Sequence, residues 1–111
     1  MKQCVEVGIC GSGPVLTGIE TSLKTLKGFR VRRLPISLAE SVWEIKMLHP
    51  HAVIFEMRAV EEAVIAAILR NIPGVRLIGI DSGRDSITVF SARARPVFSL
   101  ENLAQAILDD E

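Results

Sequence analysis

The sequence predicts one α/β domain in which helices cover both faces of a mostly parallel, five-stranded sheet, a three-layer sandwich. Short apolar runs typical of strands alternate with segments whose apolar residues recur at helical spacing. The chain has 111 residues, enough for one core and too few for two. Apolar residues make up 49% of it, which favours a packed core over disorder. We therefore expect residues 1–111 to form a single domain.

The first third of the chain predicts a strand, a helix and a second strand. Val5–Cys10 is a short apolar run that leads into the tight loop Gly11–Gly13. Pro14 suits the first turn of a helix, and Gly28 is a typical residue for ending it. Phe29–Leu34 then alternates apolar and basic residues, and such a charged strand suits the edge of a sheet.

The middle of the chain repeats this alternation. Ser37 and Glu40 have the spacing of a capping box, and the helix that they begin is expected to end near His49-Pro50. Ala52–Glu56 predicts a buried strand, because four apolar residues precede its terminal acid. Ala59–Asn71 has helical periodicity and predicts the next helix.

The last third of the chain departs from strict alternation. Two strands are expected, Val75–Ile80 followed by Asp81, and Ile87–Phe90. Only Ser82–Ser86 joins them, whereas a parallel crossover needs about a dozen residues. The two strands are therefore expected to form an antiparallel hairpin. Ser99 is the predicted cap of a final helix, whose apolar stripe is Leu100, Leu103, Ala104 and Ile107.

Composition excludes several classes of function. Thirteen basic and thirteen acidic residues give a net charge of +0, which offers no electrostatic basis for binding nucleic acid or an anionic membrane. No apolar run approaches the ~20 residues of a membrane span, and no signal peptide is evident. Cys4 and Cys10 lie six residues apart on one predicted strand, about 20 Å, too far for a disulfide. We expect a reduced, cytoplasmic protein.

Polar residues gather where the predicted parallel strands end. Glu56 ends one strand, Asp81 and Ser82 follow another, and Cys10 leads into the Gly11–Gly13 loop. In open parallel sheets, ligands bind beyond the carboxyl ends of the strands. If the strand order is 2-1-3-4-5, these residues share one rim of the sheet, and Arg58 and Arg84 flank it, with a salt bridge to Glu56 as the simplest expectation.

Four segments resemble the receiver domain of two-component response regulators, which has the flavodoxin-like fold. The segment HPHAVIFEMR resembles the family's third strand, and Glu56 falls on its phosphate-accepting aspartate. GSGPVLTGI is similar to the loop that carries the family's magnesium-binding acidic pair, and Gly11 and Ser12 fall on that pair. RLIGIDS is similar to the fourth strand, where Asp81 or Ser82 falls on a Thr or Ser that contacts the phosphoryl group. Arg95-Pro96 stands in place of a Lys-Pro.

The substitutions at these positions predict a domain without catalysis or a cofactor. Phosphoryl transfer to a carboxylate needs Mg²⁺, and Gly11 and Ser12 supply no carboxylate for it. Glu56 is one methylene longer than aspartate and places a permanent charge near the site of an aspartyl phosphate. The resemblance then implies a signalling module that acts through protein contacts, with Glu56 as pseudo-phosphoacceptor. A signalling protein is the expected partner.

Three other interpretations remain open. Cys10 in a CGSG loop is similar to the phosphocysteine of the phosphotransferase-system IIB domain, although the Thr-Ser of that family is absent. The Cys10–Gly13 loop could bind a small anion or nucleotide through backbone N–H groups. Leu16 stands where a dinucleotide fingerprint would need its third glycine. Glu56 and Asp81 together could hold a divalent cation.

Two groups of residues have more than one interpretation. The side chains of Arg30, Arg32 and Arg33 are expected to form a solvated edge rather than an anion-binding patch. Trp43 and Met47 lie one helical turn apart, and we expect Trp43 to be buried because it is the single tryptophan of a small core. The alternative is that Trp43 contacts a partner. This helix and the next have apolar residues around much of their circumference, which predicts a homodimer.

Overall fold

The computed structural model describes residues 4–34 and 36–92 and confirms the predicted architecture. Its sheet has the order β2-β1-β3-β4-β5. The strands are β1 (Val5–Cys10), β2 (Phe29–Leu34), β3 (Ala52–Glu56), β4 (Arg76–Asp81) and β5 (Ser86–Ser91). The first four strands are parallel, and β5 runs antiparallel to β4 as the short connection required. The predicted final helix and Arg95-Pro96 lie outside the described residues.

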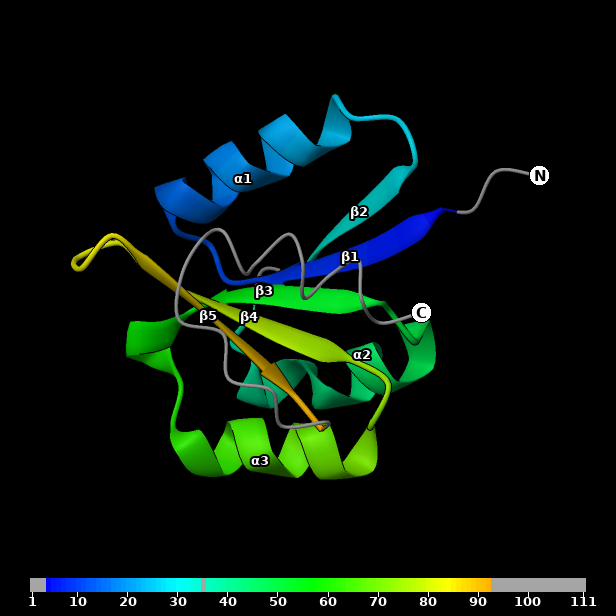
Figure 1. Ribbon diagram of the computed structural model, residues 1–111, viewed down its shortest axis with the longest axis vertical. Helices are drawn as coiled ribbons and strands as arrows, with labels where there is room; N and C mark the ends of the chain where they lie inside the picture. The colour runs from blue at the N-terminus through cyan, green and yellow to red at the C-terminus, as the bar shows by residue number, and fades with distance from the viewer. Residues whose placement is uncertain (1–3, 35, 93–111) are drawn as a thin grey trace.

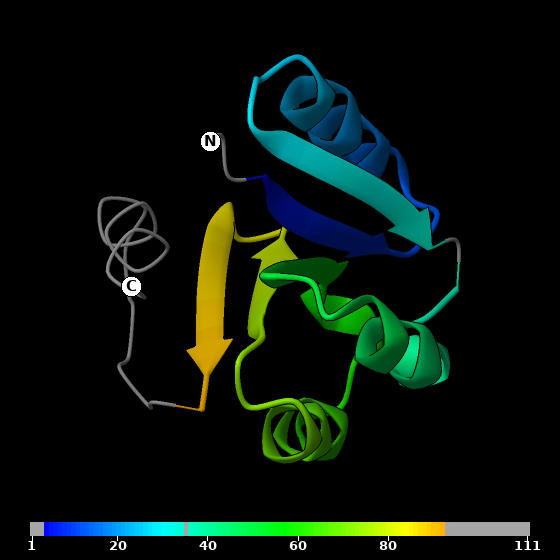
Figure 2. The same cartoon turned by 90° about the vertical axis from the view of Figure 1, so that its right-hand side faces the viewer.

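Helices lie on both faces of this sheet and complete a flavodoxin-like, three-layer sandwich (Figures 1 and 2). One face carries α1 (Pro14–Lys24), and the other carries α2 (Val42–Leu48) and α3 (Glu62–Asn71). Short 3₁₀ turns, η1 (Ala39–Ser41) and η2 (Met57–Ala59), precede α2 and α3. None of the described helices is long and apolar enough to cross a membrane.

Alternation along the strands divides the core into two apolar clusters. Val7, Ile9 and Ile54 face α1 and pack with Leu16, whereas Val53 and Phe55 face α2 and α3 and pack with their neighbours on that side. The rings of Phe55 and Phe90 stack with centroids 6.5 Å apart. Because β1 and β3 are buried on both faces, they are almost continuously apolar, as expected for central parallel strands.

The capping box at the start of η1 forms as the sequence predicts. Ser37 Oγ accepts a hydrogen bond from the Glu40 backbone N–H at 3.2 Å, and Glu40 Oε1 accepts one from the Ser37 backbone N–H at 3.4 Å. The chain leaves α2 through His49, which takes a left-handed conformation with φ of 48°. His51 then ties this turn to β1, because its Nδ1 accepts a hydrogen bond from the Glu6 backbone N–H at 3.0 Å.

Two details differ from the sequence-based predictions. The predicted helix from Ala59 begins at Glu62, because η2 first turns the chain away from the end of β3. Trp43 was expected to be buried, but it is 67% exposed and Met47 is 66% exposed. The face of this helical segment that meets the sheet is filled by Leu38, Ser41 and Ile45, which leaves the Trp43 face to solvent.

Candidate functional site

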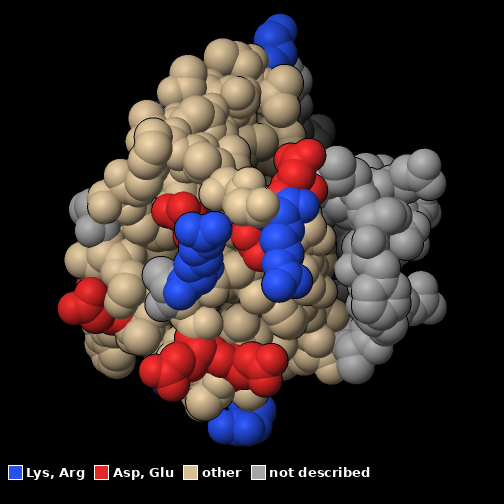
Figure 3. Space-filling model, turned by 90° about the vertical axis from the view of Figure 1, so that its left-hand side faces the viewer, with Lys and Arg blue, Asp and Glu red and all other residues tan. Residues whose placement is uncertain are grey.

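The carboxyl ends of β1, β3 and β4 lie at one rim of the sheet, together with the loops that follow them (Figure 1). Cys10 pairs with Phe55, so Glu56 stands one residue beyond the end of β1 on the neighbouring strand. Strand order reverses between β1 and β3, and this is where ligands bind in sheets of this kind. Figure 3 faces this side of the molecule and shows acidic and basic side chains interspersed on it.

The carboxylate of Glu56 lies against the glycine-rich loop after β1. A methyl group added to Gly13 would collide with Glu56 Oε1 and would stand 3.3 Å from its Cδ and 3.5 Å from its Oε2. Gly13 is also the residue that precedes α1, with an extended backbone and no side chain to cap the helix. The structure thus brings Glu56 and the Gly11–Gly13 loop together, as the sequence predicts.

The electrostatic setting of Glu56 is the positive end of a helix. The first turn of α1 contains no acidic residue, so Glu56 supplies negative charge beside that end from another strand. Such an arrangement stabilises an anion by about 0.3–1 kcal/mol. Within residues 4–34 and 36–92, Glu56 takes part in no ion pair, so the expected salt bridge to Arg58 or Arg84 does not form.

Gly11 and Ser12, which fall on the acidic pair of the receiver family, differ in how much their positions restrict the side chain. Gly11 has φ of +124°, a conformation that side chains rarely adopt, and a Cβ there would stand 2.7 Å from Leu16 Cδ1. Ser12 is exposed. The position of Gly11 is therefore closed to an aspartate for steric reasons, whereas the position of Ser12 is open.

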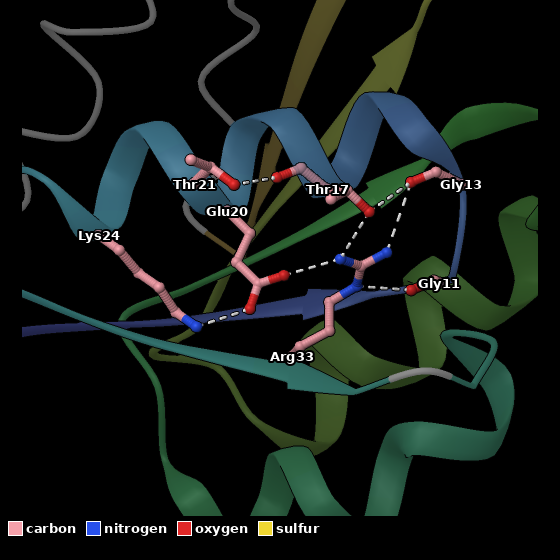
Figure 4. A network of polar contacts seen from close by, with 7 residues as sticks. All are labelled: Gly11, Gly13, Thr17, Glu20, Thr21, Lys24 and Arg33. Atoms are coloured by element: carbon pink, nitrogen blue, oxygen red, sulfur yellow. Dashed lines mark hydrogen bonds and ion pairs between the residues drawn. The ribbon is translucent and has the colours of Figure 1, made fainter.

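Arg33 donates hydrogen bonds to the glycine-rich loop, a role that was not predicted from the sequence (Figure 4). Its Nε donates a hydrogen bond to the Gly11 carbonyl at 2.7 Å, and its Nη2 donates one to the Gly13 carbonyl at 3.4 Å. Its Nη1 reaches Glu20 Oε1 at 2.8 Å and Thr17 Oγ1 at 3.2 Å. The expectation that Arg33 belongs to a solvated edge is wrong, because its side chain is only 18% exposed.

A sequence signal for this role exists in the period of the strand. Arg33 has the same parity as Phe29 and Val31, so it points toward α1, whereas Arg30 and Arg32 point to the α2 side of the sheet. Thr17 and Glu20 are three residues apart on α1 and therefore share one face of that helix. The alternation that places Phe29 and Val31 on the α1 side therefore also places Arg33 there, opposite Thr17 and Glu20.

The thiol of Cys10 is not arranged as a nucleophile. Cys10 is buried, and its burial raises the pKa of the thiol above the usual value of 9.0. A hydrogen bond with Ser41 lowers this pKa, and the nearby carboxylate of Glu44 raises it. Thiolate is the reactive form of cysteine, so a raised pKa together with burial opposes reaction at this sulfur.

Asp81 and Ser82 lie at the start of the β4–β5 hairpin. The backbone N–H of Arg84 donates to the Asp81 carbonyl at 3.2 Å and to its Oδ1 at 3.3 Å, so this carboxylate helps to close the turn. The guanidinium of Arg58 packs over Gly83, where a Cβ would collide with Nη2. Ser82 is exposed. Arg58 therefore contacts the hairpin rather than Glu56.

Metal-ligating side chains do not cluster in the part of the chain that the structure describes. No group of three or more His, Cys, Asp and Glu residues there could hold a metal ion. Glu56 and Asp81 end adjacent strands, but Glu56 packs on the β1 loop while Asp81 is bonded within its own hairpin.

Comparison with known proteins adds no relative. No family model, no curated protein and no solved structure matches this chain.

Proposed function

We propose that this domain is a non-catalytic, receiver-like signalling module that acts through protein–protein contacts. The observation that carries the proposal is the position of Glu56, at the end of β3 and against the loop after β1. A carboxylate at this switch point of a 2-1-3-4-5 sheet corresponds to the phosphate-accepting aspartate of receiver domains. Glu56 supplies a fixed negative charge there, and the module would hold one state without phosphorylation.

The residues around Glu56 support a charge that is permanent rather than added by phosphoryl transfer. Mg²⁺ has to neutralise the transferred phosphoryl group, and it requires several oxygen ligands. The positive φ of Gly11, which side chains rarely adopt, disfavours an aspartate as the first member of an acidic pair. The phosphoacceptor chemistry of the family is therefore not expected here.

Charge repulsion argues against a small anion- or nucleotide-binding module at the Cys10–Gly13 loop. A phosphate at the N-terminus of α1 would lie beside the Glu56 carboxylate, which packs against Gly13 there, so two negative charges would repel each other. The helix terminus stabilises an anion by only about 0.3–1 kcal/mol. The buried thiol of Cys10, with its raised pKa, likewise disfavours a phosphocysteine carrier.

Incubation with acetyl phosphate and Mg²⁺, followed by intact-mass measurement, tests the proposal. We expect no phosphate adduct on the wild-type chain or on Glu56→Asp, because neither variant has the metal-binding acids. A phosphate adduct on the wild-type chain, or a thermal shift of several degrees with inorganic phosphate or a nucleotide, would overturn the proposal.

Three further expectations belong to this proposal. The domain would work in the cytoplasm, with a signalling protein as its partner. A homodimer is expected as well, and the exposed side chains of Trp43 and Met47 on α2 provide apolar surface for it.

A further inference from the structure

The outer edge of β2 borders a groove that lies away from the Glu56 rim. The groove has a volume of about 280 Å³ and lies between β1, β2 and the end of α2. Gly8 leaves space in its floor, since a Cβ there would meet only Val53 Cγ2, at 3.7 Å. Leu48 and Pro50 line it on the helix side, and Arg30 and Arg32 line it on the strand side.

The two arginines of this groove point to the same face of β2. Arg30 pairs with Glu6 and Arg32 with Gly8 in the register of the sheet, so both lie on the α2 side. Two residues of strand separate their Cα atoms by about 6.6 Å. Arg30 is 69% exposed and shares its charge with Glu6, at 3.2 Å, whereas Arg32 forms no ion pair within residues 4–34 and 36–92.

The outer edge of β2 borders this groove and pairs with no other described strand. β2 is the first strand of the sheet, and among the described strands only β1 pairs with it. A second copy of this strand is a poor partner, because its arginines would face like charges. An extended acidic segment has the opposite charge and the same two-residue period as Arg30 and Arg32.

We propose that the β2 edge and its groove bind an extended acidic peptide segment, with Asp or Glu at alternate positions, from a protein partner. The peptide would add a strand to β2, and its carboxylates, all on the α2 side of the sheet, would reach over the groove to pair with Arg30 and Arg32. This inference rests on the proposed function in that the partner is a protein. Leu48 and Pro50 favour a peptide over nucleic acid, because they make one wall of the groove apolar.

The test uses a fluorescein-labelled eight-residue peptide in which glutamate alternates with valine and threonine. We measure its fluorescence anisotropy with the full chain. We expect saturable binding that weakens with salt, and no binding of a matched peptide with glutamine in place of glutamate. Backbone amide shifts on binding should be confined to Glu6–Gly8, β2 and Leu48–His51.

Two variants separate the roles of charge and groove. Arg32→Ala should weaken binding roughly tenfold, because it removes a charge-assisted pair. Arg70→Ala, an exposed arginine on α3, is the matched control and should leave binding unchanged. Gly8→Val keeps every charge but fills the groove, and should also weaken binding roughly tenfold. Thermal unfolding of each variant verifies the fold.

Several results would overturn the inference. These are no binding of the acidic peptide, equal binding by Arg32→Ala or Gly8→Val, amide shifts centred on the Glu56 rim or α3, and equally tight binding of an eight-nucleotide oligothymidine. The phosphorylation test is independent of these measurements. A phosphate adduct with intact peptide binding would refute the proposed function alone, and loss of peptide binding without an adduct would refute this inference alone.

Discussion

Arg33 connects three segments that are far apart in the sequence: β2, the loop after β1, and α1. Its hydrogen bonds to the carbonyls of Gly11 and Gly13 fix the part of the loop that lies beside Glu56. A lysine could not reproduce this geometry, because one ammonium group lacks the planar fork that meets several acceptors at once.

Substitution of Arg33 should reveal this role. We expect Arg33→Ala to lower the free energy of unfolding by about 1–3 kcal/mol, because the partly buried carbonyl groups of Gly11 and Gly13 lose a charged donor. The adjacent, exposed Arg32→Ala should change it by about 0.5 kcal/mol at most. Urea unfolding of both variants decides the matter, and equal effects would mean that the Arg33 contacts contribute nothing.

Glu20 provides a pH-dependent test of the same cluster. Its pKa is lowered from the usual 4.5, first by the hydrogen bond with Lys24 and then by the one with Arg33. A carboxylate with a lowered pKa stabilises the folded state above its unfolded pKa, and that contribution disappears as the pH falls through the folded pKa. The stability difference between wild type and Glu20→Gln should therefore be full near pH 6 and should shrink below pH 4.5. A difference that stays constant across this range would contradict the assignment.

The contact between Gly13 and Glu56 can be measured as a coupling energy. Gly13 has φ of −71°, which alanine adopts freely, so the effect of Gly13→Ala comes from the collision with the Glu56 carboxylate. The carboxylate is the end of a flexible side chain and can move aside, so the penalty should be small. We expect Gly13→Ala and Glu56→Ala to be coupled by about 0.5–1 kcal/mol in a double-mutant cycle. If the two substitutions instead had strictly additive effects on the free energy of unfolding, the Glu56 carboxylate would not contact the loop.

At the scale of elements, the sequence predicted β1, β2 and β3 with their correct bounds. Each of these strands is a run of five or six residues with glycine, proline or charged residues at or near its ends, and such residues mark where a strand stops. The antiparallel hairpin followed from the length of the connection between β4 and β5 alone, because so short a segment cannot form a parallel crossover. The start of α3 was predicted too early, because the apolar Val60 fits the helical period but takes an extended backbone (φ −130°, ψ 132°) after the 3₁₀ turn.

The end of α2 suggests a stabilising substitution. His49 has φ of 48°, a left-handed conformation that favours glycine, and its backbone N–H caps the helix by donating to Ile45. We expect His49→Gly to raise the free energy of unfolding by about 0.5–1 kcal/mol. Lys46→Gly, within the same helix, should lower it by about 1 kcal/mol. Chemical unfolding of the two variants tests this, and a loss of stability in His49→Gly would show that the histidine side chain contributes more than its backbone costs.

For the whole molecule, the sequence predicted the topology and the approach of Glu56 to the Gly11–Gly13 loop. Both follow from strand order, because the ends of adjacent parallel strands meet at one rim. The contacts that shape the rim could not be predicted in the same way. Arg58 reaches Gly83 rather than Glu56, and such choices depend on the paths of loops rather than on sequence periodicity. The exposure of Trp43 depended likewise on which face of a seven-residue helix meets the sheet.

Trp43 makes self-association of the whole chain observable, because it is the single tryptophan and it is 67% exposed. In dilute solution, we expect its emission to resemble that of tryptophan amide in water and to be fully accessible to a soluble quencher. If two copies associate through α2, the emission should shift to shorter wavelength as the protein concentration rises, because the indole leaves water. Met47→Ser should suppress this shift by removing the neighbouring apolar side chain, and sedimentation should report the same change in mass. Association without any change in emission would place the contact elsewhere, whereas a blue emission already present in the dilute monomer would contradict the exposed position of Trp43.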